Sequence, residues 1–182
     1  MNLSGSSGAW VGDSRFFGEP FVKHSVSTVE SSHMKWTDIE GRLLRAKATF
    51  LNLDRDLLAV NANERSMTHK FAEHLQREFP GWNVDCEYNR NGEFPKVLRC
   101  RLNERVSPDD EYGHTVFPDI IVHRRRVRKS LLVLEAKTSG NSDERDREKL
   151  EAFKTDENYT YSFAALLHFV TRQPFDIEIV PC

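Results

Sequence analysis

Long apolar runs, paired cysteines and an excess of basic residues are all missing from this chain of 182 residues. No run of about 18 apolar residues occurs, so we expect no membrane-spanning segment. The three cysteines, Cys86, Cys100 and Cys182, lie far apart and form no CxxC pair. This spacing disfavours a structural zinc site and a disulfide framework, and it fits reduced thiols in a cytoplasmic protein. No basic segment followed by an apolar one opens the chain, so we predict no secretory signal.

Several catalytic signatures are missing too. The sequence has no GxSxG segment, no P-loop and no HExxH pair, which disfavours the serine hydrolases, the NTPases and a zinc hydrolase. The formal net charge is -2. A protein that binds nucleic acid through its overall charge is usually basic. Any contact of this chain with a polyanion must therefore use a local patch.

Residues 1–33 differ in composition from the rest of the chain. They are rich in Ser and Gly and show no hydrophobic periodicity, so we interpret them as a flexible leader or a tag from an expression vector. Met34 is an alternative start. The aromatic residues in this segment leave a docking role open. Residues 34–182 have the length and composition of one domain.

Two helices are predicted at the start of that domain. The first begins near Trp36, with Thr37 as its cap and Glu40 three residues later. The second begins after Asn63 and ends at Pro80-Gly81. Its buried stripe consists of Met67, Phe71, Leu75 and Phe79.

Strands and one further helix are predicted for the rest of the chain. The strand-like segments are 82–90, 96–102, 116–124, 130–137, 159–170 and 175–180, and residues 116–137 form a hairpin around a tight turn. Between residues 139 and 154 we expect a loop and then a helix with Leu150 and Phe153 facing the core and Asp146 and Lys149 on an exposed face. The pattern predicts an α/β fold with a mixed central sheet flanked by helices.

Charged side chains mark the end of the strand LLVLEAK, residues 131–137. Because side chains alternate between the two faces of a strand, Glu135 and Lys137 share a face with Leu131 and Val133. Asp119 follows Pro118 at the opening of the preceding strand. If the two strands pair, Asp119 and Glu135 point into one cleft.

Two neighbouring carboxylates repel each other unless a cation lies between them. Mg²⁺ or Mn²⁺ is a suitable cation, since a hard ion takes carboxylate oxygens and meets substrate phosphate, and the carbonyl of Ala136 offers a further oxygen. Lys137 could then orient a water molecule or stabilise charge on a phosphate. Glu64 leads the apolar stripe of the second helix, where it either reaches the metal or simply benefits from the helix dipole.

The local basic patch is RRRVRK, residues 124–129, which connects the two strands of the site. Arg124, Arg125, Arg126, Arg128 and Lys129 either contact phosphates or form a solvated hairpin turn.

The set Glu64, Pro118-Asp119 and Glu135-Ala136-Lys137 resembles the PD-(D/E)XK nuclease superfamily, which has the restriction-endonuclease-like fold. The likeness covers about residues 60–170, leaves the first helix as an addition, and is greatest to small, stand-alone bacterial proteins. It implies that Asp119 and Glu135 bind Mg²⁺ or Mn²⁺, that Lys137 assists the attacking water, and that Glu64 completes the metal shell.

These observations predict a metal-dependent nuclease acting on nucleic acid, with DNA as the expected polymer. The family relationship implies products with a 5′-phosphate. A homodimer is compatible with the prediction, because cutting two strands often uses two sites. One alternative is a catalytically inactive binding or interaction module on the same fold, and another is a hydrolase that uses two carboxylates on a different substrate, such as a glycosidase.

Overall fold

The computed structural model describes residues 34–88, 90–91, 94–95, 97–98, 114–115, 117–125, 129–138, 144–155 and 161–182. The leader 1–33, most of the predicted strand 96–102, and Arg126 and Arg128 lie outside these residues. Within the described ranges no helix is long and apolar enough to span a lipid bilayer.

In the described residues the sheet is preceded by the helices α1 (Trp36–Leu53), α2 (Arg55–Ala59) and α3 (Glu64–Glu78). Asn63 caps α3 as predicted, since its side-chain oxygen accepts a hydrogen bond from the backbone N–H of Ser66 at 2.8 Å. The prediction that Thr37 caps α1 is wrong. The cap is Lys35, whose backbone N–H donates to Asp38 at 2.9 Å, so Thr37 already belongs to the first turn. The short helix α2 was not predicted.

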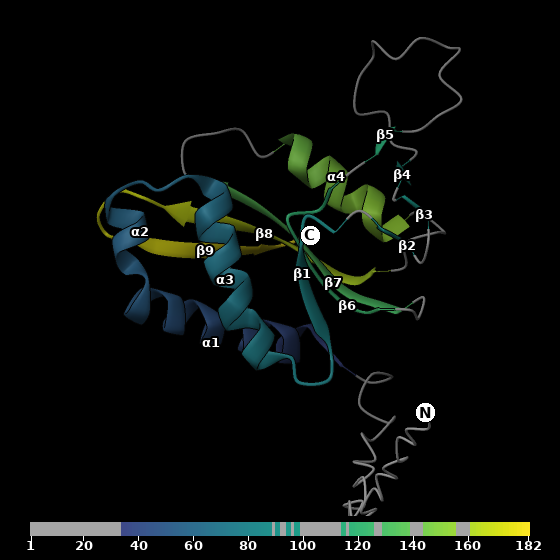
Figure 1. The fold of residues 1–182 in the computed structure, drawn as a ribbon, viewed down its shortest axis with the longest axis horizontal. Coiled ribbons are helices and arrows are strands. Elements are labelled where there is room, and N and C mark those ends of the chain that lie inside the picture. Colours follow the sequence, from purple (N-terminus) through teal and green to yellow (C-terminus); the bar gives the residue numbers. More distant parts are fainter. Residues whose placement is uncertain are drawn as a thin grey trace, which may run out of the picture.

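The main sheet has the order β1-β6-β7-β8-β9. Its strands are β1 (Asn83–Cys86), β6 (Ile120–Arg124), β7 (Lys129–Thr138), β8 (Tyr161–Val170) and β9 (Asp176–Pro181), with α4 (Glu144–Thr155) between β7 and β8. Only the β7–β8 pair is parallel, and the helix α4 makes the crossover between these two strands. The chain is therefore mixed α/β with a five-stranded mixed sheet flanked by helices, as the sequence predicted (Figure 1).

Between residues 90 and 115, the described residues include very short strands that pair outside the main sheet. The strand β2 (Arg90–Asn91) pairs with β3 (Phe94–Pro95), and β4 (Val97–Leu98) pairs with β5 (His114–Thr115). These pairs lie outside the main sheet.

Each face of the main sheet carries its own core. One face packs against α1 and α3, where Leu43, Phe50 and Phe71 meet side chains such as Leu134 and Leu167. The other face packs against α4, where Leu150 and Phe153 meet Ile121, Val133 and Leu166. Leu150 and Phe153 are fully buried, so the predicted inward face of this helix is confirmed for these two residues.

A β-bulge changes the predicted faces at the start of β7. Val122 pairs with Leu132 and His123 pairs with Ser130, which leaves Leu131 as the extra residue. Leu131 packs with Leu132 in the core beside α1 and α3, whereas Val133 packs in the core beside α4. The prediction that Leu131 shares a face with Val133 is therefore wrong, because alternation fails across the bulge.

Candidate active site at the ends of β6 and β7

Asp119 and Glu135 lie at neighbouring strand ends. β6 begins at Ile120 rather than at residue 116, because Pro118 has no N–H to donate to a strand ladder, so Asp119 stands just before the strand. Ile120 pairs with Leu134 across the antiparallel ladder, which brings Asp119 beside Glu135 in the sequence register. The Oδ2 atom of Asp119 accepts a hydrogen bond from the backbone N–H of Ala136 at 2.8 Å. The predicted convergence of these two strand ends is thus present.

Glu135 is a buried acid with one unsatisfied oxygen. The residue is 2% exposed. Its Oε2 atom accepts a hydrogen bond from Lys149 at 2.7 Å, and its Oε1 atom is buried with no hydrogen-bond partner among the described residues. Burial raises the pKa of Glu135 well above its ordinary value, the ammonium of Lys149 opposes this, and the nearby charge of Asp119 raises the pKa further. A buried polar atom without a partner is costly, so a ligand that reaches Oε1 would relieve that cost.

Lys149 is part of this site, which corrects its prediction as an exposed residue of the helix. Its ammonium donates to Glu135 and also to the backbone carbonyl of Phe117 at 2.8 Å, and its side chain is only 17% exposed. Phe117 is two residues before Asp119 in the chain. The cation thus contacts both strand ends that carry the acids.

Lys137 also reaches α4. As predicted, Lys137 and Glu135 project to one face of β7, and both meet side chains of this helix. Lys137 forms an ion pair with Asp146, and both side chains are largely buried. The prediction that Asp146 is exposed is therefore wrong as well.

A helical periodicity could have identified the two missed residues. Asp146, Lys149, Leu150 and Phe153 are spaced i, i+3, i+4 and i+7, which is the spacing of one helix face. The apolar pair on that face is buried, so the charged pair on the same face must point towards the sheet.

Glu64 lies beside the end of β7 and lines the same cavity as Asp119. It is the first residue of α3, and its Oε2 atom accepts a hydrogen bond from the backbone N–H of Thr138 at 2.9 Å. In the described part of the chain, no three His, Cys, Asp or Glu side chains converge into a metal-binding group. Glu64 therefore ties the start of α3 to the end of β7 in this structure.

A cavity of about 1080 Å³ opens beside Asp119, and Glu135 is not among the residues that line it. It lies along the first half of α3, and its walls include Leu57 of α2, His69 of α3, Cys86 of β1, and both Glu64 and Asp119. Burial raises the pKa of the Cys86 thiol to about 11, so this cysteine is not a nucleophilic thiolate at neutral pH. The cavity gives solvent and ligands access to Asp119.

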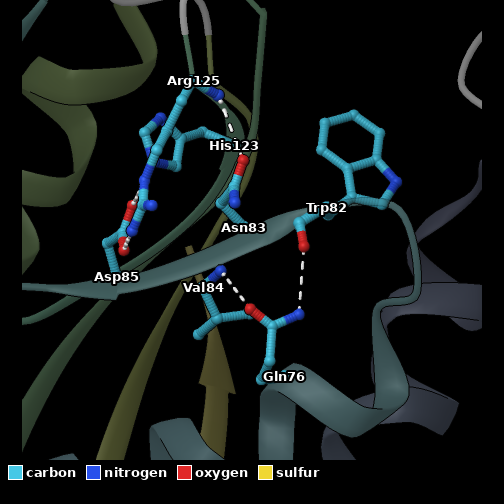
Figure 2. A network of polar contacts seen from close by, with 7 residues as sticks. All are labelled: Gln76, Trp82, Asn83, Val84, Asp85, His123 and Arg125. Carbon is cyan, nitrogen blue, oxygen red and sulfur yellow. Dashed lines mark hydrogen bonds and ion pairs between the residues drawn. The ribbon is translucent and has the colours of Figure 1, made fainter. Parts of the chain in front are cut away.

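The described members of the basic run contact protein groups. The guanidinium of Arg124 lies over the Trp82 ring, 4.9 Å from its centroid. Arg125 pairs with Asp85 through both carboxylate oxygens, and His123 contacts the same carboxylate at 2.6 Å (Figure 2). Burial acts to raise the pKa of Asp85, but the hydrogen bonds from Arg125 and His123 outweigh it, so this pKa lies below its ordinary value. A phosphate at Arg125 would therefore compete with Asp85. For Lys129 only the backbone is described.

The strand β1 that supplies Asp85 is held in place from both sides. The side-chain amide of Gln76 donates to the Trp82 carbonyl at 3.0 Å and accepts from the Val84 N–H at 2.9 Å, which joins α3 to β1 (Figure 2). Asn83 accepts from the backbone N–H of Arg125 at 3.2 Å. These contacts fix the first turn residue after β6 against β1.

Comparisons of this chain with protein-family models, with curated proteins and with solved structures found no match.

Proposed function

We propose that this chain is a metal-dependent phosphodiesterase that hydrolyses nucleic acid, with DNA as the expected polymer. The observation that carries the proposal is the pair of carboxylates at neighbouring strand ends, Asp119 and Glu135, one of which has a buried oxygen without a partner. The order α3, β1, β6, β7, α4, β8 supports a restriction-endonuclease-like domain of the PD-(D/E)XK type, because that pattern needs its acids and its lysine on these elements. α1 and α2 are then additions to that pattern at the start of the domain.

The acidic pair fits a hard divalent ion. Mg²⁺ is commonly held by one or two protein carboxylates and keeps several waters, so the lack of a three-residue group among the described residues does not conflict with it. Asp119, Glu135 and the carbonyl of Ala136 would hold the ion. A bound Mg²⁺ or Mn²⁺ supplies a Lewis acid for phosphate oxygens and an acidified water. In this structure Glu64 has an oxygen engaged with Thr138, so we assign it a supporting role at the edge of the site.

The remaining residues act through charge and position. Glu135 lies in a nearly water-free environment, where electrostatic interactions are stronger than in bulk water. The ammonium of Lys137 lies on the same face of β7 and can stabilise negative charge that develops on a phosphate. For this role Lys137 must share its ammonium between the phosphate and Asp146.

A specific observation favours one alternative, a nuclease-fold binding module without catalytic activity. All four predicted polar side chains already have a partner within the chain: Glu64 with Thr138, Asp119 with Ala136, Glu135 with Lys149, and Lys137 with Asp146. A set of acids and a lysine satisfied in this way can be a purely structural network. The alternative predicts binding of nucleic acid or protein without cleavage.

The test is a cleavage panel of single-stranded and double-stranded DNA and RNA with Mg²⁺, Mn²⁺ or EDTA. We expect cleavage that EDTA abolishes. In Glu135→Ala and Asp119→Asn the cleavage rate should fall more than about 100-fold, because mutating residues that merely contact metal ligands already lowers activity about 10–100-fold. Glu151→Ala, an exposed acid of α4, is the matched control and should cut normally. Cutting that survives EDTA, or no cutting of any polymer by the wild type, contradicts the proposal.

A further inference from the structure

Two hydrogen bonds of Lys149 close a ring of contacts around the acidic pair. The ammonium joins Oε2 of Glu135, at 2.7 Å, to the carbonyl oxygen of Phe117, at 2.8 Å. Phe117 leads through Pro118 to Asp119, whose Oδ2 accepts from the N–H of Ala136, the residue after Glu135. The ring therefore runs from Lys149 through both acid-bearing segments and back. In this ring the Lys149 ammonium is supplied by α4, and the other groups belong to β7 or to residues 117–119 before β6.

The position of this ammonium is fixed by packing. Leu150, the next residue of α4, and Phe153 are both fully buried against the sheet. The side chains of Lys149 and Glu135 are 17% and 3% exposed, so water competes little for this ion pair. A side chain on a packed helix is held in position more precisely than one on a loop.

Lys137 does not serve the pair in the same way. Its ammonium is engaged with Asp146, and Lys149 is the cation that contacts Glu135. The sequence pattern alone predicts Lys137 as the lysine of the site. The contacts instead show two lysines with different partners, Lys137 with Asp146 and Lys149 with Glu135.

We infer that Lys149 is a positioning residue that holds Asp119 and Glu135 in one fixed arrangement, so that the unpartnered Oε1 of Glu135 is presented to a ligand. Its consequence for catalysis rests on the proposed function. With Oε2 held by the ammonium, rotation of the carboxylate is restricted and Oε1 keeps one direction. Without Lys149, Glu135 can rotate, and the segment Phe117–Asp119 loses its link to α4.

The first test needs neither metal nor substrate. In EDTA, hydrogen exchange of the Ala136 N–H, followed by NMR, reports on its bond to Asp119. We expect Lys149→Met to speed this exchange at least about 10-fold, while the N–H of Leu166 in the neighbouring strand stays protected. Lys154→Met is the matched control, since Lys154 is on the same helix and donates to the carbonyl of Cys182 instead. Unchanged exchange at Ala136 in Lys149→Met would overturn the inference.

A second variant covers the case in which Lys149→Met does not fold because it leaves Glu135 as an unpaired buried acid. The double variant Lys149→Met with Glu135→Gln has no such charge. The same faster exchange at Ala136 is expected in it relative to Glu135→Gln alone. Equal exchange in these two proteins would count against a positioning role.

The second test uses cleavage. We expect Lys149→Met to lower kcat about 100-fold with little change in KM, because a misplacement of about 1 Å has effects of this size. Lys149→Arg should recover most of this loss, since a guanidinium can also donate to two oxygens. A lysine that only stabilised the fold would lower the melting temperature and leave the kcat of the folded protein intact. If the wild type cleaves nothing, the proposed function fails, and the exchange experiment alone still decides the role of Lys149.

Discussion

Among the acids in the described part of the chain, Glu135 is the one that is almost fully buried. Its carboxyl group is buried between β7 and α4, and its two oxygens differ, one bound to Lys149 and the other without a partner. Burial favours the neutral form of the acid, and this is the main reason that its pKa is raised. The group therefore links folding stability to pH.

The sign of this linkage gives a prediction. Below the ordinary pKa of 4.5, Glu135 is protonated in both the folded and the unfolded chain. Between pH 4.5 and the pKa of the folded protein, this carboxyl group is ionised in the unfolded chain but stays protonated in the folded chain. The free energy of unfolding therefore falls as the pH rises through this range. We expect Glu135→Gln to remove this loss, so that in EDTA its stability relative to the wild type rises with pH from about 4.5 upward. Urea unfolding across this range measures it.

The matched control is Glu151→Gln, whose side chain is 62% exposed. Its stability should run parallel to that of the wild type across the same pH range. Parallel curves for Glu135→Gln would show that Glu135 does not hold its proton in the folded protein.

Helix α4 is the element that connects the core to the site. Its buried stripe holds two apolar side chains, Leu150 and Phe153, and the same face continues into Lys149 and Asp146. Packing at one end of the stripe thus determines where two charges lie at the other. This coupling makes the helix a sensitive place for a core substitution.

For Leu150→Ala we expect a loss of about 2–5 kcal/mol in the free energy of unfolding, because the change leaves a cavity against Ile121 and Val133. We also expect weaker cleavage, since Lys149 is the adjacent residue. Chemical denaturation measures the first effect and a cleavage assay at a temperature well below the transition measures the second. Glu151→Ala, exposed on the same helix, should change stability by less than about 0.5 kcal/mol. A cost for Leu150→Ala as small as that would contradict the packing described for α4.

At the scale of the whole molecule, two cores flank one sheet and join the helices into one unit. Each core cluster of the described residues draws on elements between Trp36 and Cys182. α1 packs on α3 and is linked to β9 by the ion pair of Lys47 with Asp176 at 2.8 Å. The first helix is therefore part of the folded domain.

A chain that begins at Met34 should fold like the full chain. We expect its melting temperature to lie within about 2 °C of that of the 182-residue chain, because every described core residue lies at Met34 or later. Calorimetry of the two proteins checks this. A much lower melting temperature would instead indicate that the aromatic residues of the leader dock on the domain.

Much of the fold could be predicted because it depends on local patterns. The stripe of α3, its Asn63 cap, the β6–β7 hairpin and the buried side chains Leu150 and Phe153 follow from periodicity and capping, which act over a few residues. The neighbourhood of Asp119 and Glu135 was predictable for the same reason, since a hairpin brings its two strand ends together.

Other features were decided by contacts between distant segments. Leu131 and Val133 lie on opposite faces of β7 because a bulge shifts the register of that strand. Arg125 pairs with Asp85, which is 40 residues earlier in the chain. Glu64 accepts a hydrogen bond from the backbone of Thr138, which is 74 residues later in the chain. No local pattern specifies such partners, because each depends on how whole elements pack.

The sequence by itself determined the two longer helices α1 and α3, the strands of the main sheet, and the approach of Asp119 to Glu135 at neighbouring strand ends. Only the tertiary structure decided which cation accompanies those acids. Lys137 is adjacent to Glu135 along β7, but α4 crosses that face and places Lys149 on Glu135 and Asp146 on Lys137. The physical reason is that a buried carboxylate takes the cation that packing brings within hydrogen-bond distance, and packing is a property of the assembled elements.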